Sequence, residues 1–159
     1  MTRGAVVFAI GALDAFLHDL VLEIVPAFGP NSQDLTASMR EIAKQDPSLA
    51  LRVALKPDAA RQEFQAALDE WLSARSFQGP EAVVRAASYV GVAWSWHELD
   101  ESLGADTAAE LAKFTGMRHD IIHRGRKPDV GRGRAEWCLN LVDAIAAALN
   151  GEAVKLYNA

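Results

Sequence analysis

The chain of 159 residues contains one cysteine, Cys138, and so cannot form a disulfide bond within itself. This excludes the small secreted folds that depend on several disulfides, and it is typical of a protein from a reducing compartment. Internal repeats, low-complexity tracts and interdomain linkers are also absent from the sequence. We therefore expect residues 1–159 to form one domain, which is long enough to bury a sizeable core.

Runs of alternating β-branched residues are scarce. Half of the residues are hydrophobic, alanine and leucine are abundant, and glycine and proline separate the apolar segments. This composition favours an all-α fold, a single helical bundle. The ambiguous stretch is residues 48–56, where apolar residues alternate as they would in a strand. An isolated strand would have nothing to pair with, so we expect a short helix or a packed loop there.

The sequence does not indicate a targeting or membrane segment. The apolar run from Ala5 to Leu13 follows Arg3 and has the length of a signal-peptide core, but no obvious cleavage site comes after it. Asp14 and His18 follow at amphipathic spacing, which predicts a cytoplasmic helix and no membrane span. These two residues share a helix face, a pattern that most often marks a solvent-exposed face.

The spacing of apolar residues and helix breakers predicts where the helices begin and end. Helices are expected over residues 5–25, 31–45, 58–74 and 80–90, then in a short segment ending at Gly104, a longer one ending at Gly125 and a last one ending at 150–151. Trp71 lies on the apolar stripe of its helix and is expected in the core.

Several helix starts carry side chains that can cap them. Asn31 or Ser32 is expected to cap the second helix, and Asp58 the third. The segments Ser95–Glu98 and Thr107–Glu110 have the spacing of a capping box. In this motif, the side chain of the first residue accepts from the backbone amide of the fourth, and the side chain of the fourth accepts from the backbone amide of the first.

The formal net charge of −5 hides a strong asymmetry. Residues 118–134 carry six basic side chains against Asp120 and Asp129, a local balance of +4, so the rest of the chain carries −9. An acidic body with one basic patch is poorly suited to coating nucleic acid indiscriminately. It can, however, seat a phosphate locally.

The basic patch begins in the stretch Met117–Gly125, which offers an arginine, two imidazoles and a carboxylate before a glycine that can end a helix. His119 and His123 are four residues apart and share a helix face. Arg118 and His123 are five apart, separated by about 140° around the axis. A phosphate held by both would therefore lie along the end of this helix or between two copies of it.

Two catalytic interpretations of this stretch compete. In the first, residues 119–123 (HDIIH) are a variant of the zinc-hydrolase pattern His-Glu-x-x-His, with Asp120 as the base and Glu136 or Asp143 as a third ligand. In the second, Arg118 and His123 handle a phosphate without metal. The imidazole then moves a proton, and the guanidinium stabilises charge on a pentavalent phosphorus.

Three segments of the chain resemble the HEPN superfamily, and in particular its RiboL-PSP branch. Residues 118–123 (RHDIIH), followed by Arg124 and Gly125, are similar to the HEPN signature of an arginine, a polar residue, three further residues and a histidine near the end of a late helix. Residues 11–17 (GALDAFL) are similar to the first-helix segment of that branch, and residues 76–81 (SFQGPE) to its middle segment.

The resemblance implies a helical bundle of the HEPN type and a metal-independent endoribonuclease without a cofactor, often the toxin of a toxin–antitoxin or defence module. It further implies a homodimer whose two motifs face one cleft, with RNA as substrate, because the 2′-hydroxyl attacks the adjacent phosphate. An antitoxin protein is a further implied partner. The roles implied for the residues are general acid–base for His123, phosphate clamp for Arg118, orienting residue for His119, RNA contact for Arg124, Arg126 and Lys127, and supporting acid for Asp14.

Alternative functions remain open at this point. A HEPN domain without catalysis would bind RNA or mediate dimerisation, and in a purely structural module the Arg118–His123 pair would cap a helix and bind a neighbouring carboxylate. The exposure of the pair distinguishes these hypotheses. A structural role predicts a buried His123 with a protein partner, and a nuclease predicts both side chains open to a shared cleft.

Overall fold

The structure, a computed structural model, describes residues 2–28, 36, 39–40, 43–44, 47–55 and 59–157. Within these ranges the regular structure is entirely helical, which confirms the all-α expectation. Most of the helix expected over residues 31–45, with its caps Asn31 and Ser32, lies outside the described residues, as does the expected cap Asp58.

The helices are α1 (Thr2–Phe28), α3 (Leu49–Leu55), α4 (Ala60–Ser73), α5 (Pro80–Tyr89), α6 (His97–Leu103), α7 (Thr107–Arg124) and α8 (Arg132–Tyr157). The ambiguous stretch 48–56 thus contains the short helix α3, one of the two outcomes expected for it. Helix α4 begins with Ala59 at its N-cap position.

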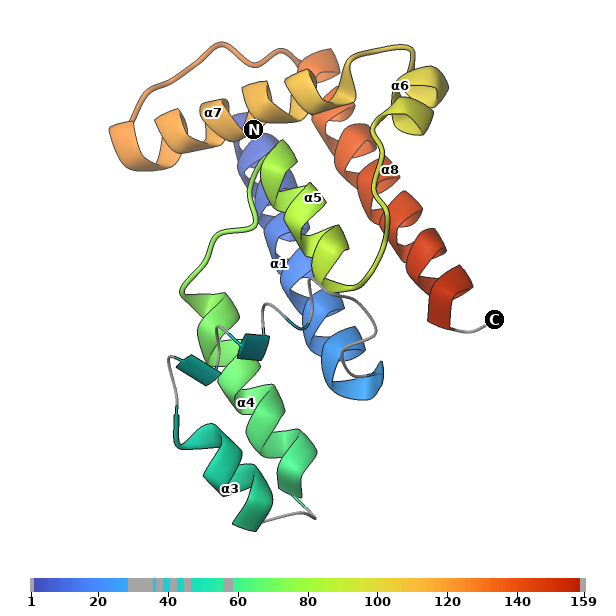
Figure 1. The fold of residues 1–159 in the computed structure, drawn as a ribbon. Helices are drawn as coiled ribbons and strands as arrows, with labels where there is room; N and C mark the ends of the chain where they lie inside the picture. Colours follow the sequence, from blue (N-terminus) through green and yellow to red (C-terminus); the bar gives the residue numbers. More distant parts are fainter. Residues whose placement is uncertain are drawn as a thin grey trace.

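Helix α1 is the element against which most of the others pack. It contacts α8, α7, α5 and α4, and Figure 1 shows α1 and α8 side by side and running in the same direction. Helix α7 crosses one end of this pair, and its C-terminal part projects beyond the other helices (Figure 1). The hairpin of α3 and α4 lies toward the opposite end of α1.

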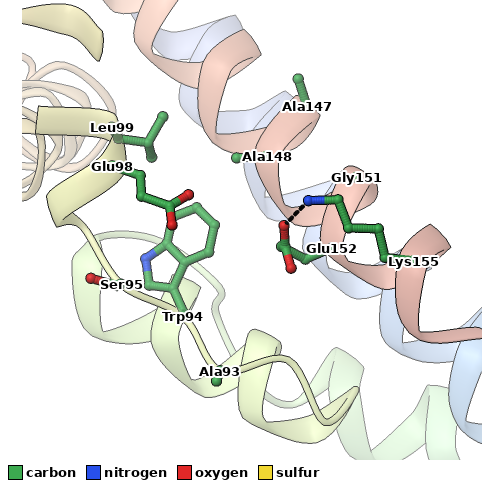
Figure 2. A pocket seen from close by; sticks show the side chains of 10 residues that line it. All are labelled: Ala93, Trp94, Ser95, Glu98, Leu99, Ala147, Ala148, Gly151, Glu152 and Lys155. Carbon is green, nitrogen blue, oxygen red and sulfur yellow. Dashed lines mark hydrogen bonds and ion pairs between the residues drawn. The ribbon is translucent and has the colours of Figure 1, made fainter. Parts of the chain in front are cut away.

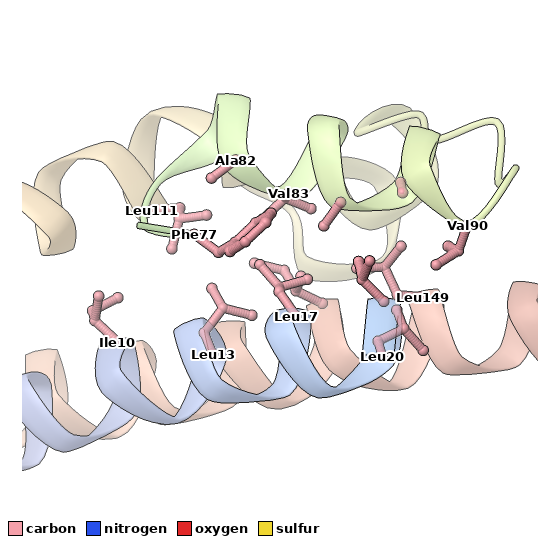
Figure 3. Close-up of a cluster of buried hydrophobic side chains, with 14 of the residues drawn as sticks. Ile10, Leu13, Leu17, Leu20, Phe77, Ala82, Val83, Val90, Leu111 and Leu149 are labelled. Atoms are coloured by element: carbon pink, nitrogen blue, oxygen red, sulfur yellow. The ribbon is translucent and has the colours of Figure 1, made fainter. Parts of the chain in front are cut away.

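The core lies between α1, α5 and α8. Leu13 and Leu17 of α1 and Leu149 of α8 are fully buried and face Phe77 and Val83 across the layer (Figure 3). Phe77 comes from the segment before α5 and is only 1% exposed, so this segment is anchored to the core. The expectation for Trp71 is confirmed as well, because it is 5% exposed.

By length and composition, α1 could cross a membrane. In this fold, one of its faces is buried against the other helices, with Val6, Ile10, Leu13 and Leu17 fully covered. The same length and composition also occur in the core helices of soluble proteins. The expectation of a cytoplasmic helix stays a prediction.

Two helices continue past the ends that were predicted for them. Helix α1 runs through Pro26 to Phe28, since a proline in the last turn removes only one hydrogen bond. Helix α8 runs past 150–151 to Tyr157, whose hydroxyl donates to the Val90 carbonyl at 2.6 Å and whose ring lies 4.5 Å from that of Phe28. These tertiary contacts outweigh the poor helix propensity of glycine at position 151.

Both predicted capping boxes were wrong. Helix α7 is capped one residue earlier, by Asp106, whose carboxylate accepts from the Ala109 amide at 2.9 Å. Thr107 is instead buried and donates its amide and hydroxyl to Asp100, which lowers the pKa of that carboxyl. Helix α6 has Trp96 at its N-cap position and no capping bond from its side chain.

Candidate functional site

The stretch of residues 117–125 occupies the projecting end of α7. The first half of this helix is held in the core by Leu111 and Phe114, which are fully buried. Further along, Ile122 is 45% exposed and His123 is exposed. The helix ends as predicted at Gly125, whose φ of 60° is the left-handed conformation that glycine adopts readily.

Arg118 points back from this end toward the segment before α5. It is half-buried, and its Nη1 donates to the Gln78 side-chain oxygen at 2.6 Å. Its Nε atom is also buried, with no hydrogen-bond partner among the described residues. The bond from Nη1 to Gln78 therefore orients the guanidinium, and it is the one hydrogen bond that the described residues accept from its five N–H donors.

Gln78 is in turn held by Asp14 of α1. The Gln78 amide nitrogen donates to Asp14 Oδ2 at 3.1 Å, and the Phe77 backbone amide donates to Asp14 Oδ1 at 2.6 Å. Asp14 is half-buried, so the expected solvent-exposed face was wrong for this residue. The structure thus connects Asp14 to Arg118 through one intervening side chain.

Sequence reasoning missed Gln78. Its only signal was its position inside the segment of residues 76–81, because a neutral amide carries no charge or metal-binding pattern that marks it. His18, the other polar residue on that face of α1, lies 3.3 Å from a carboxylate oxygen of Asp69 and takes no part in this network.

The two histidines of the motif lie together, as their spacing predicted. The ring centroids of His119 and His123 are 4.9 Å apart with an angle of 42° between the planes, and both residues are exposed. No hydrogen bond or ring contact among the described residues joins Arg118 to His123. Arg118 is bonded to Gln78 and lies about 140° around the helix axis from His123, so these two side chains leave the helix in different directions.

Asp120 organises the basic side chains at the end of α7. Its carboxylate accepts from Arg124 at 3.0 Å and from Arg126 at 3.3 Å, and both arginines remain more than half exposed. Lys127 is exposed in the following loop. These three cations follow His123 within four residues, and Asp120 offsets only one unit of their positive charge.

Arg134, which the sequence also counts in the basic patch, is engaged in the fold. Arg134 pairs with Glu110 and lies over the Phe114 ring, with its guanidinium carbon 4.5 Å from the ring centroid. Bonds from Lys113, Arg134 and Trp137 lower the pKa of the Glu110 carboxyl. This cluster ties α7 to α8.

The donor set does not fit the zinc interpretation. Within the described residues, no group of three or more His, Cys, Asp or Glu side chains could hold a metal ion. Glu136 accepts from Arg132 at 2.8 Å, and Asp143 lines a groove between α1 and α8 with Phe16 and Leu139. Asp120, the expected base, is engaged by two arginines.

Two further hollows lie on the surface of the described residues. One, of about 330 Å³, is lined by Gln78 itself together with Glu81 and Thr115 among others. The other, of about 260 Å³, has Trp94 and Glu98 facing the Glu152–Lys155 pair of α8 (Figure 2). Because this second hollow carries two carboxylates and one cation, it is not suited to a phosphate.

Comparison of the chain with known protein families, curated proteins and solved structures found no match. What the site can do chemically follows from its own residues. It offers an oriented guanidinium, two exposed imidazoles, and three exposed cations that attract polyanions.

Proposed function

We propose that the protein is a metal-independent endoribonuclease of the HEPN type. The observation that carries the proposal is the hydrogen-bonded connection between Asp14, Gln78 and Arg118. Each of these residues belongs to one of the three segments that resemble HEPN domains, and the segments are far apart in the sequence. A contact between all three is expected if the segments build one site.

The chemistry of the site suits cleavage of RNA by its own 2′-hydroxyl. An imidazole takes the 2′-hydroxyl proton, the 2′-oxygen forms a bond to phosphorus, and the bond to the 5′-oxygen breaks as that oxygen receives a proton. The Arg118 guanidinium stabilises the charge that develops on phosphorus. His123 acts as the acid–base, and its neighbour His119 orients it.

The basic side chains around the histidines account for RNA as the ligand. Arg124, Arg126 and Lys127 are exposed within a few residues of His123, where they can contact phosphates on either side of the cut. His123 is exposed, which the nuclease hypothesis requires and a buried helix-capping role does not. Arg118 is half-buried and bonded to Gln78, so the second part of that expectation, a cleft that both side chains share, is not met within one chain.

The active form in this proposal is a homodimer. Arg118 and His123 point in different directions within one chain, so the Arg118 of one copy is paired with the His123 of the other. The exposed Ile122 beside His123, on the projecting end of α7, supplies an apolar contact for such a partner. An antitoxin protein, a role in defence and a cytoplasmic location belong to the same proposal and are supported by the resemblance alone.

The separation of Arg118 from His123 within one chain also supports a second candidate, a non-catalytic RNA-binding or dimerisation module. The two candidates differ in whether RNA is cut. The nuclease and the RNA-binding module both predict that Arg124→Ala and Lys127→Ala weaken RNA binding and reduce its dependence on salt, whereas a module that only dimerises predicts no RNA binding.

The deciding experiment is cleavage of a mixed RNA substrate in excess EDTA. We expect the wild type to cut, and Arg118→Ala and His123→Ala each to lower the rate by about a hundredfold or more. Arg85→Ala and His97→Ala are matched controls, since both residues are exposed and lie outside the motif. RNA that is bound but never cut would favour the non-catalytic module, and activity restored by zinc after EDTA treatment would revive the metal hypothesis.

A further inference from the structure

The amide of Gln78 has one hydrogen-bonding orientation that satisfies both of its neighbours. An ionised carboxylate only accepts hydrogen bonds, so the NH₂ group of Gln78 must face Asp14. The carbonyl oxygen then faces Arg118, whose guanidinium only donates. Reversal of the amide would break both bonds, so Asp14 fixes which end of Gln78 the arginine meets.

The backbone around Gln78 is also fixed from both sides. Phe77 before it is buried in the core and donates its amide to Asp14. Gly79 after it has a φ of 90° and leads into Pro80, the first residue of α5. An L-residue at position 79 would be strained, so the turn that presents Gln78 is set by the sequence itself.

A neutral partner suits an arginine that must hold a phosphate. A carboxylate at this place would orient the guanidinium and cancel its charge at the same time. Gln78 accepts one hydrogen bond and leaves the charge intact, while the negative charge of Asp14 stays one side chain further away. Gln78 can therefore orient the arginine without neutralising its charge.

We infer that Gln78 is a positioning residue, which Asp14 orients and which in turn orients the Arg118 guanidinium toward the RNA phosphate. The inference rests on the proposed ribonuclease function for its consequence in catalysis. Its structural part, the dependence of Arg118 on Gln78 and Asp14, can be measured separately. Asp14 then acts on the arginine through Gln78.

The first measurement follows the Arg118 Nε–H signal by NMR in protein labelled with ¹⁵N, assigned through its loss in Arg118→Lys. Gln78→Ala should shift this signal and increase its exchange with water, because the guanidinium is released. Asp14→Asn should do the same with Gln78 still in place, since an amide at position 14 favours the reversed Gln78. Gln62→Ala, an exposed glutamine of α4, is the matched control.

The second measurement compares cleavage kinetics in the same variants. We expect Gln78→Ala and Asp14→Asn to lower kcat by about tenfold to a hundredfold with a smaller change in KM, as for other residues that orient a catalytic group. Gln78→Glu should weaken RNA binding as well and reduce its salt dependence, because the new carboxylate cancels the arginine's charge.

A double variant separates position from charge. In Asp14→Asn combined with Gln78→Glu, the amide introduced at position 14 can donate to the new carboxylate at position 78, which again accepts from Arg118. The Arg118 signal should return toward its protected state while cleavage stays low. This pattern would not arise if the single variants merely destabilised the fold, and thermal unfolding of each variant checks that they are folded.

The outcomes distinguish this inference from the proposed function. If the wild type does not cut RNA, the ribonuclease proposal fails, and the Arg118 signal still supports or overturns the positioning role. If Arg118→Ala abolishes cleavage while Gln78→Ala changes neither the signal nor kcat, the inference about Gln78 is overturned and the nuclease stands.

Discussion

Glu110 is the residue that ties the start of the motif helix to α8. Its side chain is only 15% exposed and accepts hydrogen bonds from Lys113 of its own helix and from Arg134 and Trp137 of α8. These contacts hold the pKa of the carboxyl below its ordinary value of 4.5. A charged group that is stabilised in this way contributes to folding only while it is ionised.

We therefore expect Glu110→Gln to lower the free energy of unfolding near neutral pH by about 1–3 kcal/mol, the usual cost of disrupting a hydrogen-bonded charge. Since the folded pKa is depressed, the contribution is present above the unfolded pKa and disappears as the pH falls through the folded pKa. The free energies of unfolding of the wild type and the variant, measured in urea, should thus become equal at low pH. Glu136→Gln, at an exposed pair, should show little difference at any pH; equal pH dependence in both variants would contradict this account.

At the scale of single residues, the sequence identified charged groups better than their partners. Arg118, His119 and His123 were visible because few residue types handle phosphate. Gln78 was not, since its role depends on two neighbours 40 and 64 positions away. Similarly, Arg134 counted toward the basic patch in the sequence, although the fold commits it to Glu110.

The two ends of α7 are held differently. Its first turn is capped by Asp106 and its last turn projects from the fold. Asp106→Ala should lower the free energy of unfolding by about 1 kcal/mol, because the Ala109 amide loses its acceptor.

The control for this substitution is Asp129→Ala, at an exposed residue of the loop after α7. Thr107→Ala should cost at least as much as Asp106→Ala through the loss of the buried bond to Asp100, although Thr107 does not cap the helix. Urea denaturation measures both. An unchanged stability of Asp106→Ala would mean that the cap contributes nothing.

Helix positions were predictable from apolar spacing, whereas helix ends were not. The stripe of α1 and the stop at Gly125 follow from local rules that the sequence displays. Asp106 caps α7 through a local bond, but Thr107 is unavailable as a cap because Asp100 binds it, and the end of α8 depends on the contacts of Tyr157. Tertiary contacts decide such ends, and local spacing does not contain them.

For the whole molecule, the proposed composite site makes a prediction about mixtures. Arg118→Ala and His123→Ala dimers should each be inactive, but subunit exchange between them yields mixed dimers. One site in each mixed dimer then combines an intact Arg118 from one chain with an intact His123 from the other. Part of the wild-type activity should return on mixing, measured in EDTA after incubation long enough for exchange.

The control for this experiment is each variant mixed with itself. Ile122→Asp, which puts a charge on the expected contact, should reduce both dimerisation and recovery, as followed by analytical ultracentrifugation. If the two variants are shown to exchange subunits and the mixture still does not cleave RNA, each site is built within one chain.

The most direct test of the central claim uses two oligonucleotides in excess EDTA. One is RNA with a mapped cleavage position, and the other carries a single 2′-deoxy nucleotide on the 5′ side of that position. The account predicts that only the first is cut there, leaving a 2′,3′-cyclic phosphate and a 5′-hydroxyl, and that Arg118→Ala and His123→Ala cut neither. Equal cleavage of both oligonucleotides, or products with a 3′-hydroxyl, would contradict it.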